Sequence, residues 1–195
     1  MNLPPFLFPP SSWFVFAIHN GAMPVSMGGS FEKQTFRNRI AIAGPNGVQN
    51  LIIPIAHTGH KQDFNEVKIS SQENWQRQHQ ASLNAAYRKS PFYEFYDYKI
   101  HALMQENTDS LALCIESSIL LLCQAFQLPI QPQFTNEFNH QFQSFPLPEY
   151  SQVFENKFGF RDGLSALDLL FNLGPEASDY LMDAAKSIHQ TNSLP

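Results

Sequence analysis

The spacing of apolar residues changes near residue 71, and this change limits the folds that the chain can adopt. Before it, short apolar runs are separated by turn residues, which predicts strands and loops in residues 1–70. After it, apolar residues recur every three or four positions, which predicts mainly helices in residues 71–195. Strands followed by helices are typical of α+β proteins. A chain of 195 residues can form one substantial core, so we predict a single α+β domain.

The strand prediction rests on several short apolar runs. The strongest signal is the turn sequence GPNG at residues 44–47, which lies between two β-branched runs and predicts a β-hairpin. The hairpin strands are expected over residues 37–43 and 48–55, and further strands over residues 14–18, 24–27 and 66–70.

The helical part is expected to contain an irregular arm. Helices are predicted over residues 72–89, 92–105, 109–127, 164–173 and 175–190, with Thr108 or Asp109 as the cap of the third. Residues 128–150 are rich in Pro, Phe, Gln and Asn, and we expect them to lie over the core. The phenylalanines of this arm that need burial are Phe134, Phe138, Phe142 and Phe145.

Charge is spread unevenly along the chain. The formal net charge is −5, yet residues 1–99 carry nine Lys/Arg against six Asp/Glu. An anion site is therefore expected in the first half. No basic stretch is long enough to give each phosphate of a nucleic-acid duplex its own donor, so we expect no nucleic-acid partner.

The cysteines and apolar segments suggest a cellular location. Cys114 and Cys123 fall nine residues apart on one predicted helix, about 13.5 Å along its axis and on opposite faces, so they cannot pair there. A chain without a disulfide framework fits a reducing compartment. The N-terminus lacks the pattern of a signal peptide, and the longest apolar helix is short for a bilayer. We expect a cytoplasmic protein with no membrane span.

The segment KQTFRNRIAI raises the question of ligand binding. If it is a strand, Lys33, Arg37 and Arg39 share one face, whereas Asn38 lies on the apolar face with Ile40. Guanidinium groups suit phosphate or carboxylate, which favours an anion site. The alternative from spacing alone is a solvated strand face, with Asn38 bonded to a loop.

The first predicted helix carries a mixed stripe. Trp75, His79 and Leu83 fall on one face, with Tyr87 at its margin. His79 is either a general base or a core histidine held by a backbone carbonyl. On a later helix, Ser165 and Asp168 resemble a capping pair and, with Asn172, are expected on a solvated helix face, the alternative being a ligand-facing polar stripe.

Known catalytic and cofactor motifs are missing from the sequence. It contains no P-loop, no Gly-x-Gly-x-x-Gly segment and no Gly-x-Ser-x-Gly elbow. His57 and His60 are spaced like metal ligands, but only Asp63 is near them, so we predict no metal site. The sequence identifies no cofactor.

Long motifs in both halves carry a family resemblance. They read KQTFRNR, IPI and VKIS around the hairpin, ENWQRQHQASLNAAYRKSPFYEFY along the first helices, and QVFENKFGF and LSALDLLFNLGP near the end. Over residues 7–190 these motifs make the chain similar to the WbqC-like family of bacterial proteins. The C-terminal motif resembles the version of the family common in Bacteroidetes.

The resemblance implies a role in surface polysaccharide or O-antigen biosynthesis, because members accompany enzymes of that chemistry. We expect a group transferase, acyl or aminoacyl, acting on an amino- or nucleotide-sugar. The alternative is a non-catalytic ligand-binding or scaffold protein of a glycan-assembly complex. The implied partners are a small anionic or sugar-type ligand and proteins of the polysaccharide pathway.

The resemblance also indicates site residues. The family's Asn-Arg pair falls on Asn38 and Arg39, its Trp and His fall on Trp75 and His79, and its aromatic residue falls on Tyr87. As catalytic residues we expect His79 to move a proton and Asn38 to orient a carbonyl or hydroxyl. The substrate-binding residues would be Lys33, Arg37, Arg39, Trp75 and Tyr87.

Two segments depart from the family pattern. Residues 4–9 read PPFLFP, where members often carry a Gln-Pro-x-Tyr-x-Pro type of segment. Residues 25–30 read VSMGGS, where relatives often have acidic and histidine residues. If those polar groups belong to the site, this member is altered or inactive.

Overall fold

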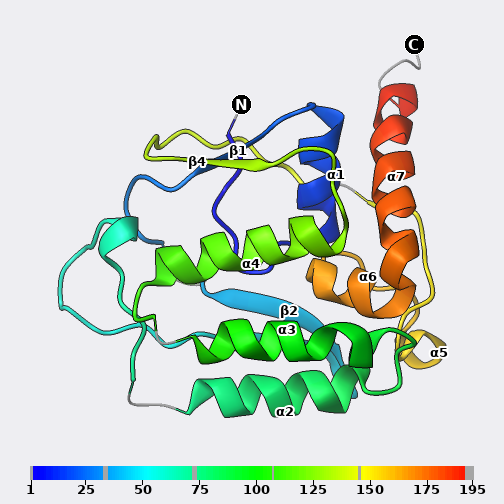
Figure 1. Ribbon diagram of the computed structural model, residues 1–195, viewed down its shortest axis with the longest axis horizontal. Helices are drawn as coiled ribbons and strands as arrows, with labels where there is room; N and C mark the ends of the chain where they lie inside the picture. Colours follow the sequence, from blue (N-terminus) through cyan, green and yellow to red (C-terminus); the bar gives the residue numbers. More distant parts are fainter. Residues whose placement is uncertain (1, 33–34, 72–73, 107, 145, 192–195) are drawn as a thin grey trace.

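The computed structural model describes residues 2–32, 35–71, 74–106, 108–144 and 146–191. Most strands precede most helices, as the change of spacing near residue 71 predicts, and the fold is α+β. In Figure 1, α2, α3 and α4 lie along one another, and α7 stands beside α1.

Two small sheets contain the strands. The predicted hairpin is confirmed: β2 (Arg39–Gly44) pairs antiparallel with β3 (Gly47–Ile52), and Pro45-Asn46 form the tip. β1 (Met23–Ser26) pairs in parallel with β4 (Pro132–Thr135), a strand that the sequence did not predict because it lies in the Phe-rich arm. Residues 66–70 form no strand of their own; a 3-10 turn, η1 (Phe64–Glu66), precedes single bridges there.

The strand predicted over residues 14–18 is wrong, because this segment lies in helix α1 (Ser11–His19). Six of its nine residues are buried, so the helix is apolar nearly all round and shows no helical periodicity. Pro10 stands directly before the helix, and the Trp13 indole N–H donates to the Pro4 carbonyl at 2.9 Å.

The later helices fall close to their predicted positions. They are α2 (Trp75–Tyr87), α3 (Tyr93–Gln105), α4 (Leu111–Ala125), α5 (Glu155–Phe158), α6 (Ala166–Leu173), η2 (Gly174–Glu176) and α7 (Ala177–Thr191). The cap of α4 is Ser110, not Thr108 or Asp109: its hydroxyl accepts from the Leu113 N–H at 3.4 Å. Across the described part of the chain, no helix is long and apolar enough to cross a membrane.

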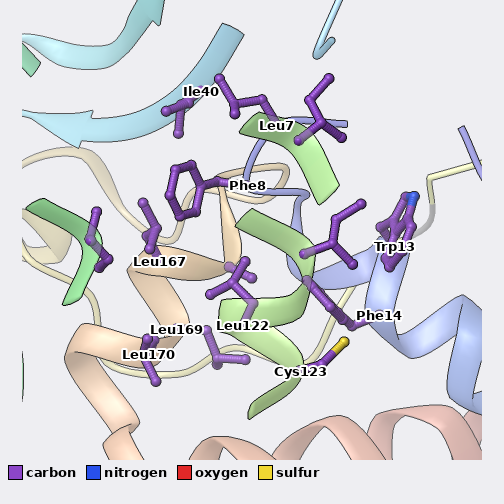
Figure 2. Packing of buried hydrophobic residues seen from close by; sticks show 14 of the residues in the cluster. Leu7, Phe8, Trp13, Phe14, Ile40, Leu122, Cys123, Leu167, Leu169 and Leu170 are labelled. Carbon is purple, nitrogen blue, oxygen red and sulfur yellow. The ribbon is translucent and has the colours of Figure 1, made fainter. Parts of the chain in front are cut away.

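One hydrophobic core joins the elements. Figure 2 shows side chains of the N-terminal segment, β2, α4 and α6 gathered in one cluster, including Phe8, Ile40, Leu122 and Leu167. Both cysteines lie in α4, are buried and are free, as their spacing predicts.

The Phe-rich arm is only partly buried. Phe134 and Phe142 pack against the core, but Phe138 is 58% exposed, which contradicts the expectation that it is buried; Phe145 lies outside the described residues. The Phe138 ring fills the space beside Gly29, and the Asn136 carbonyl fills the space beside Gly28. The arm therefore packs directly against the backbone of Gly28 and Gly29, and a side chain at either position would collide with the arm.

Candidate functional site

The segment before the hairpin is a turn instead of a strand. Residues 35–38 bend, and β2 begins only at Arg39, so the prediction that Arg37 and Arg39 share one strand face is wrong. The Thr35 hydroxyl causes the bend, because it donates to the Glu32 carbonyl and accepts from the Arg37 N–H. Lys33 lies outside the described residues.

Arg37 is buried in this turn. Its exposed fraction is 2%, its Nη1 donates to the Ser30 carbonyl at 2.8 Å, and its guanidinium lies 5.5 Å from the centre of the Phe64 ring. Burial lowers the pKa of the guanidinium, partly offset by the charge of Glu32. Through these contacts, Arg37 links the loop that contains Ser30 to η1.

Asn38 closes the open end of the hairpin. Its Nδ2 donates to the Ile53 carbonyl at 3.0 Å, and its own carbonyl accepts from the Ile53 N–H at 2.9 Å. Its Oδ1 is buried and has no hydrogen-bond partner among the described residues. A buried acceptor without a partner costs about 1–3 kcal/mol, so this amide is only half satisfied.

Arg39 is the next residue and is half-buried. It stands opposite Ile52 in the β2–β3 register. Its Nε is buried without a hydrogen-bond partner, and no carboxylate of the described residues is within ion-pair distance. Among the described candidate residues, Arg39 has the most exposed side chain.

His79 lies in the core between Trp75 and β3. It is 3% exposed, and its Nε2 donates to the Ile52 carbonyl at 3.1 Å. The Trp75 ring meets the imidazole edge-on at 5.1 Å. Burial lowers the pKa of His79 to about 4, although the bond to Ile52 favours the protonated form. Nδ1 of the neutral ring is therefore a buried acceptor, and no described residue donates to it.

The fold thus brings Asn38, Arg39 and His79 to the same end of β3. Asn38 and His79 bond to consecutive carbonyls, which point in opposite directions along an extended chain, so they approach β3 from its two sides. Each of the three residues has one buried polar atom without a partner in the described structure. Together these atoms offer one donor and two acceptors.

Tyr87 lies away from this end. It is fully buried, and its hydroxyl accepts from the Ala43 N–H at 2.9 Å, near the tip of the hairpin. Its ring packs against Phe171 at 5.0 Å. Burial raises the pKa of the phenol well above its ordinary value. Tyr87 is thus separated from His79 by two turns of α2 and joins a second polar group.

Asp168 is the centre of that second group, and its prediction as a solvated residue is wrong. It is fully buried, and its Oδ2 accepts from the Tyr150 hydroxyl at 2.7 Å and from Gln152 Nε2 at 2.9 Å. Burial raises the pKa of Asp168 to about 6, against hydrogen bonds from Tyr150, Tyr87 and Gln152 that lower it. The signal in the sequence was its place inside the apolar run ALDLLF.

The loop with His57 and His60 encloses a surface hollow of about 330 Å³. Both histidines are exposed, and His60 Nδ1 bonds to the Thr58 carbonyl of the same loop. Among the described residues, no group of three or more His, Cys, Asp or Glu could hold a metal ion.

The structure thus defines an α+β domain in which three polar residues, each with one buried unpartnered atom, lie at the open end of a hairpin. Comparison with protein families finds a match: the model of the WbqC-like protein family matches residues 28–141 and 131–180 of the chain. These segments span most of the chain, which therefore belongs to the WbqC-like protein family. No curated protein and no solved structure matches the chain.

Proposed function

We propose that the chain is a non-catalytic, ligand-binding or scaffold member of its family, serving a glycan-assembly complex in surface polysaccharide or O-antigen biosynthesis. The observation that carries this proposal is the state of His79. A general base must reach its substrate and have a pKa near the working pH. His79 is 3% exposed, its pKa is about 4, and its N–H is committed to a backbone carbonyl.

The other expected site residues also serve the fold. Arg37 clamps two loops, Trp75 packs on His79, and Tyr87 bonds to the hairpin. The arm covers Gly28 and Gly29, in the segment that departs from the pattern expected from the family resemblance. Both features favour a structural role for these residues over a transferase centre.

Arg39 is the residue on which ligand binding would depend. Its side chain is only partly buried and has no acidic partner in the described structure. A guanidinium in that state suits a carboxylate, a phosphate or a hydroxyl-rich sugar. We therefore expect a small anionic or sugar-type ligand to contact Arg39.

One observation favours a group transferase as the second candidate. Asn38, Arg39 and His79 each have one buried unpartnered atom and lie at the same end of β3, and unsatisfied or perturbed polar groups are common at catalytic sites. In this alternative an acyl or aminoacyl group is transferred to an amino- or nucleotide-sugar, and His79 must become accessible when the ligand binds.

A ligand screen with three variants separates the two functions. Thermal shift is measured with nucleotide-sugars, amino-sugars, acyl donors and inorganic phosphate on the unmodified chain, Arg39→Ala and His79→Gln. Arg77→Ala is the matched control, because Arg77 is an exposed arginine of α2. A ligand at 100 times its Kd stabilises by roughly 2.7 kcal/mol.

The proposal expects a shift that Arg39→Ala loses and that Arg77→Ala and His79→Gln keep, with no product formed. If no ligand shifts the unmodified chain, the scaffold form of the proposal stands and the ligand-binding form fails. Product formation that His79→Gln abolishes while the fold stays intact would establish the transferase instead.

A further inference from the structure

The β2–β3 sheet has one covered edge and one open edge. On the β2 side, the Ala43 N–H donates to the Tyr87 hydroxyl and the Ala41 carbonyl accepts from the Ser165 N–H at 2.8 Å. These bonds occupy two outward backbone groups of β2 with groups from α2 and the start of α6. A further strand is therefore expected to pair with β3.

The register identifies the free groups of β3. In an antiparallel pair, alternate residues direct their N–H and C=O away from the partner strand. Ile53 bonds back to Asn38, so residues 49 and 51 face β2, and Val48, Asn50 and Ile52 face outward. The outward carbonyl of Ile52 already accepts a hydrogen bond from His79. No hydrogen bond from the described residues reaches the backbone of Val48 or Asn50.

This open edge lacks the lysines, prolines and bulges that often prevent strand pairing. Natural edge strands carry lysines, prolines or bulges that block another strand. Residues 47–52 read GVQNLI, with no charge and no proline, and their pairing with β2 has no bulge. Val48 is 51% exposed and Ile52 is 47% exposed, so apolar area lies along the same edge.

We propose that β3 pairs antiparallel with β3 of a second copy of the chain, with Gln49 opposite Gln49. In this register, each copy uses the N–H and C=O groups of both Val48 and Asn50. It does not need the Ile52 carbonyl, which accepts a hydrogen bond from His79. Val48 of each copy then exchanges two backbone hydrogen bonds with Asn50 of the other. Because the segment is uncharged and the register is symmetric, a second copy fits the edge without like-charge repulsion.

The short length of the edge also favours a second copy over a long extended peptide. The hairpin tip ends it at Gly47, and the His79 ring closes it at Ile52. A longer peptide strand would leave most of its backbone groups without partners. The same short strand of another copy matches the edge in length.

The first experiment measures the mass of the full chain by analytical ultracentrifugation from micromolar to millimolar concentration. Asn50→Pro is compared with Asn50→Ala, and circular dichroism checks the fold of each. The Asn50 N–H faces away from β2, so proline removes only the outward donor. We expect a dimer for the unmodified chain and Asn50→Ala, and dimerisation weaker by about tenfold or more for Asn50→Pro. A monomer throughout, or equal dimerisation of a folded Asn50→Pro, would overturn the proposal.

A charge exchange tests the register without any proline. Gln49 is exposed, its Nε2 donates to the Ser82 hydroxyl of α2 at 3.1 Å, and in the proposed dimer it lies opposite Gln49 of the second copy. Gln49→Lys alone and Gln49→Glu alone should each weaken the dimer, because like charges directly opposite destabilise a strand pair. An equal mixture of the two variants should form the heterodimer. Absence of the heterodimer from the mixture would rule out this register.

Discussion

His79 donates a hydrogen bond from its Nε2 to the carbonyl oxygen of Ile52, 3.1 Å away, and this bond ties α2 to the outer edge of β3. The ring is buried and neutral, and Trp75 packs against it. The same contact removes the imidazole from solvent and closes one end of the strand edge. A residue that the sequence motif suggests as a catalytic base is thus part of the framework of the fold.

His79→Ala should therefore destabilise the protein. The substitution leaves the Ile52 carbonyl without its donor and opens a space beside Trp75, so we expect a loss of about 1–3 kcal/mol in the free energy of unfolding. Urea denaturation measures it. His79→Gln is the control, because a glutamine amide can donate to the same carbonyl. An unchanged urea midpoint for His79→Ala would show that the bond contributes nothing.

Two buried groups should give opposite pH dependences of stability. The pKa of His79 falls from 6.5 to about 4 on folding, so the unfolded chain takes up a proton first as the pH falls below 6.5. Stability is then lost between pH 6.5 and 4. The pKa of Asp168 rises from 3.8 to about 6, so the folded chain takes up a proton first, and stability is gained as the pH falls from 6 to 3.8. Each effect is at most about 3–3.5 kcal/mol.

Because these windows overlap, the two effects should largely cancel in the unmodified chain. Asp168→Asn removes the stability that protonation of the Asp168 carboxyl adds. This variant should therefore show a clear loss of stability on acidification from pH 6.5 to 4. His79→Gln removes the stability loss that protonation of His79 in the unfolded chain causes. This variant should therefore become more stable over the same pH range. Urea midpoints measured at several pH values test both. Parallel pH curves for the two variants would contradict the assigned pKa directions.

Tyr87→Phe should destabilise the hairpin. Its hydroxyl accepts from the Ala43 N–H at the edge of β2, and without it a buried donor has no partner. We expect a loss of about 1–3 kcal/mol in the free energy of unfolding. Tyr98→Phe is the matched control, because Tyr98 is 59% exposed on α3 and should change stability by less than about 0.5 kcal/mol. Equal thermal midpoints for the two variants would argue against the role of Tyr87.

The elements with strong local signals could be predicted from sequence. The hairpin follows from GPNG between two β-branched runs, and α2 follows from the stripe that includes Trp75 and His79. α1 could not be recognised, because a helix buried on most sides has no polar face to reveal its period. The turn at residues 35–38 was missed because a single Thr35 hydroxyl, bonded on both sides, produces it.

The sequence by itself determined the α+β class, the order of most elements, the free cysteines and, through long motifs, membership of the WbqC-like protein family. These properties depend on periodicity and on matches along the chain. Only the tertiary structure decided that His79 is sealed against Ile52, that Asp168 lies in the core and that β3 keeps an open edge. Burial and hydrogen-bond partners depend on residues far apart in the chain, which no local pattern records.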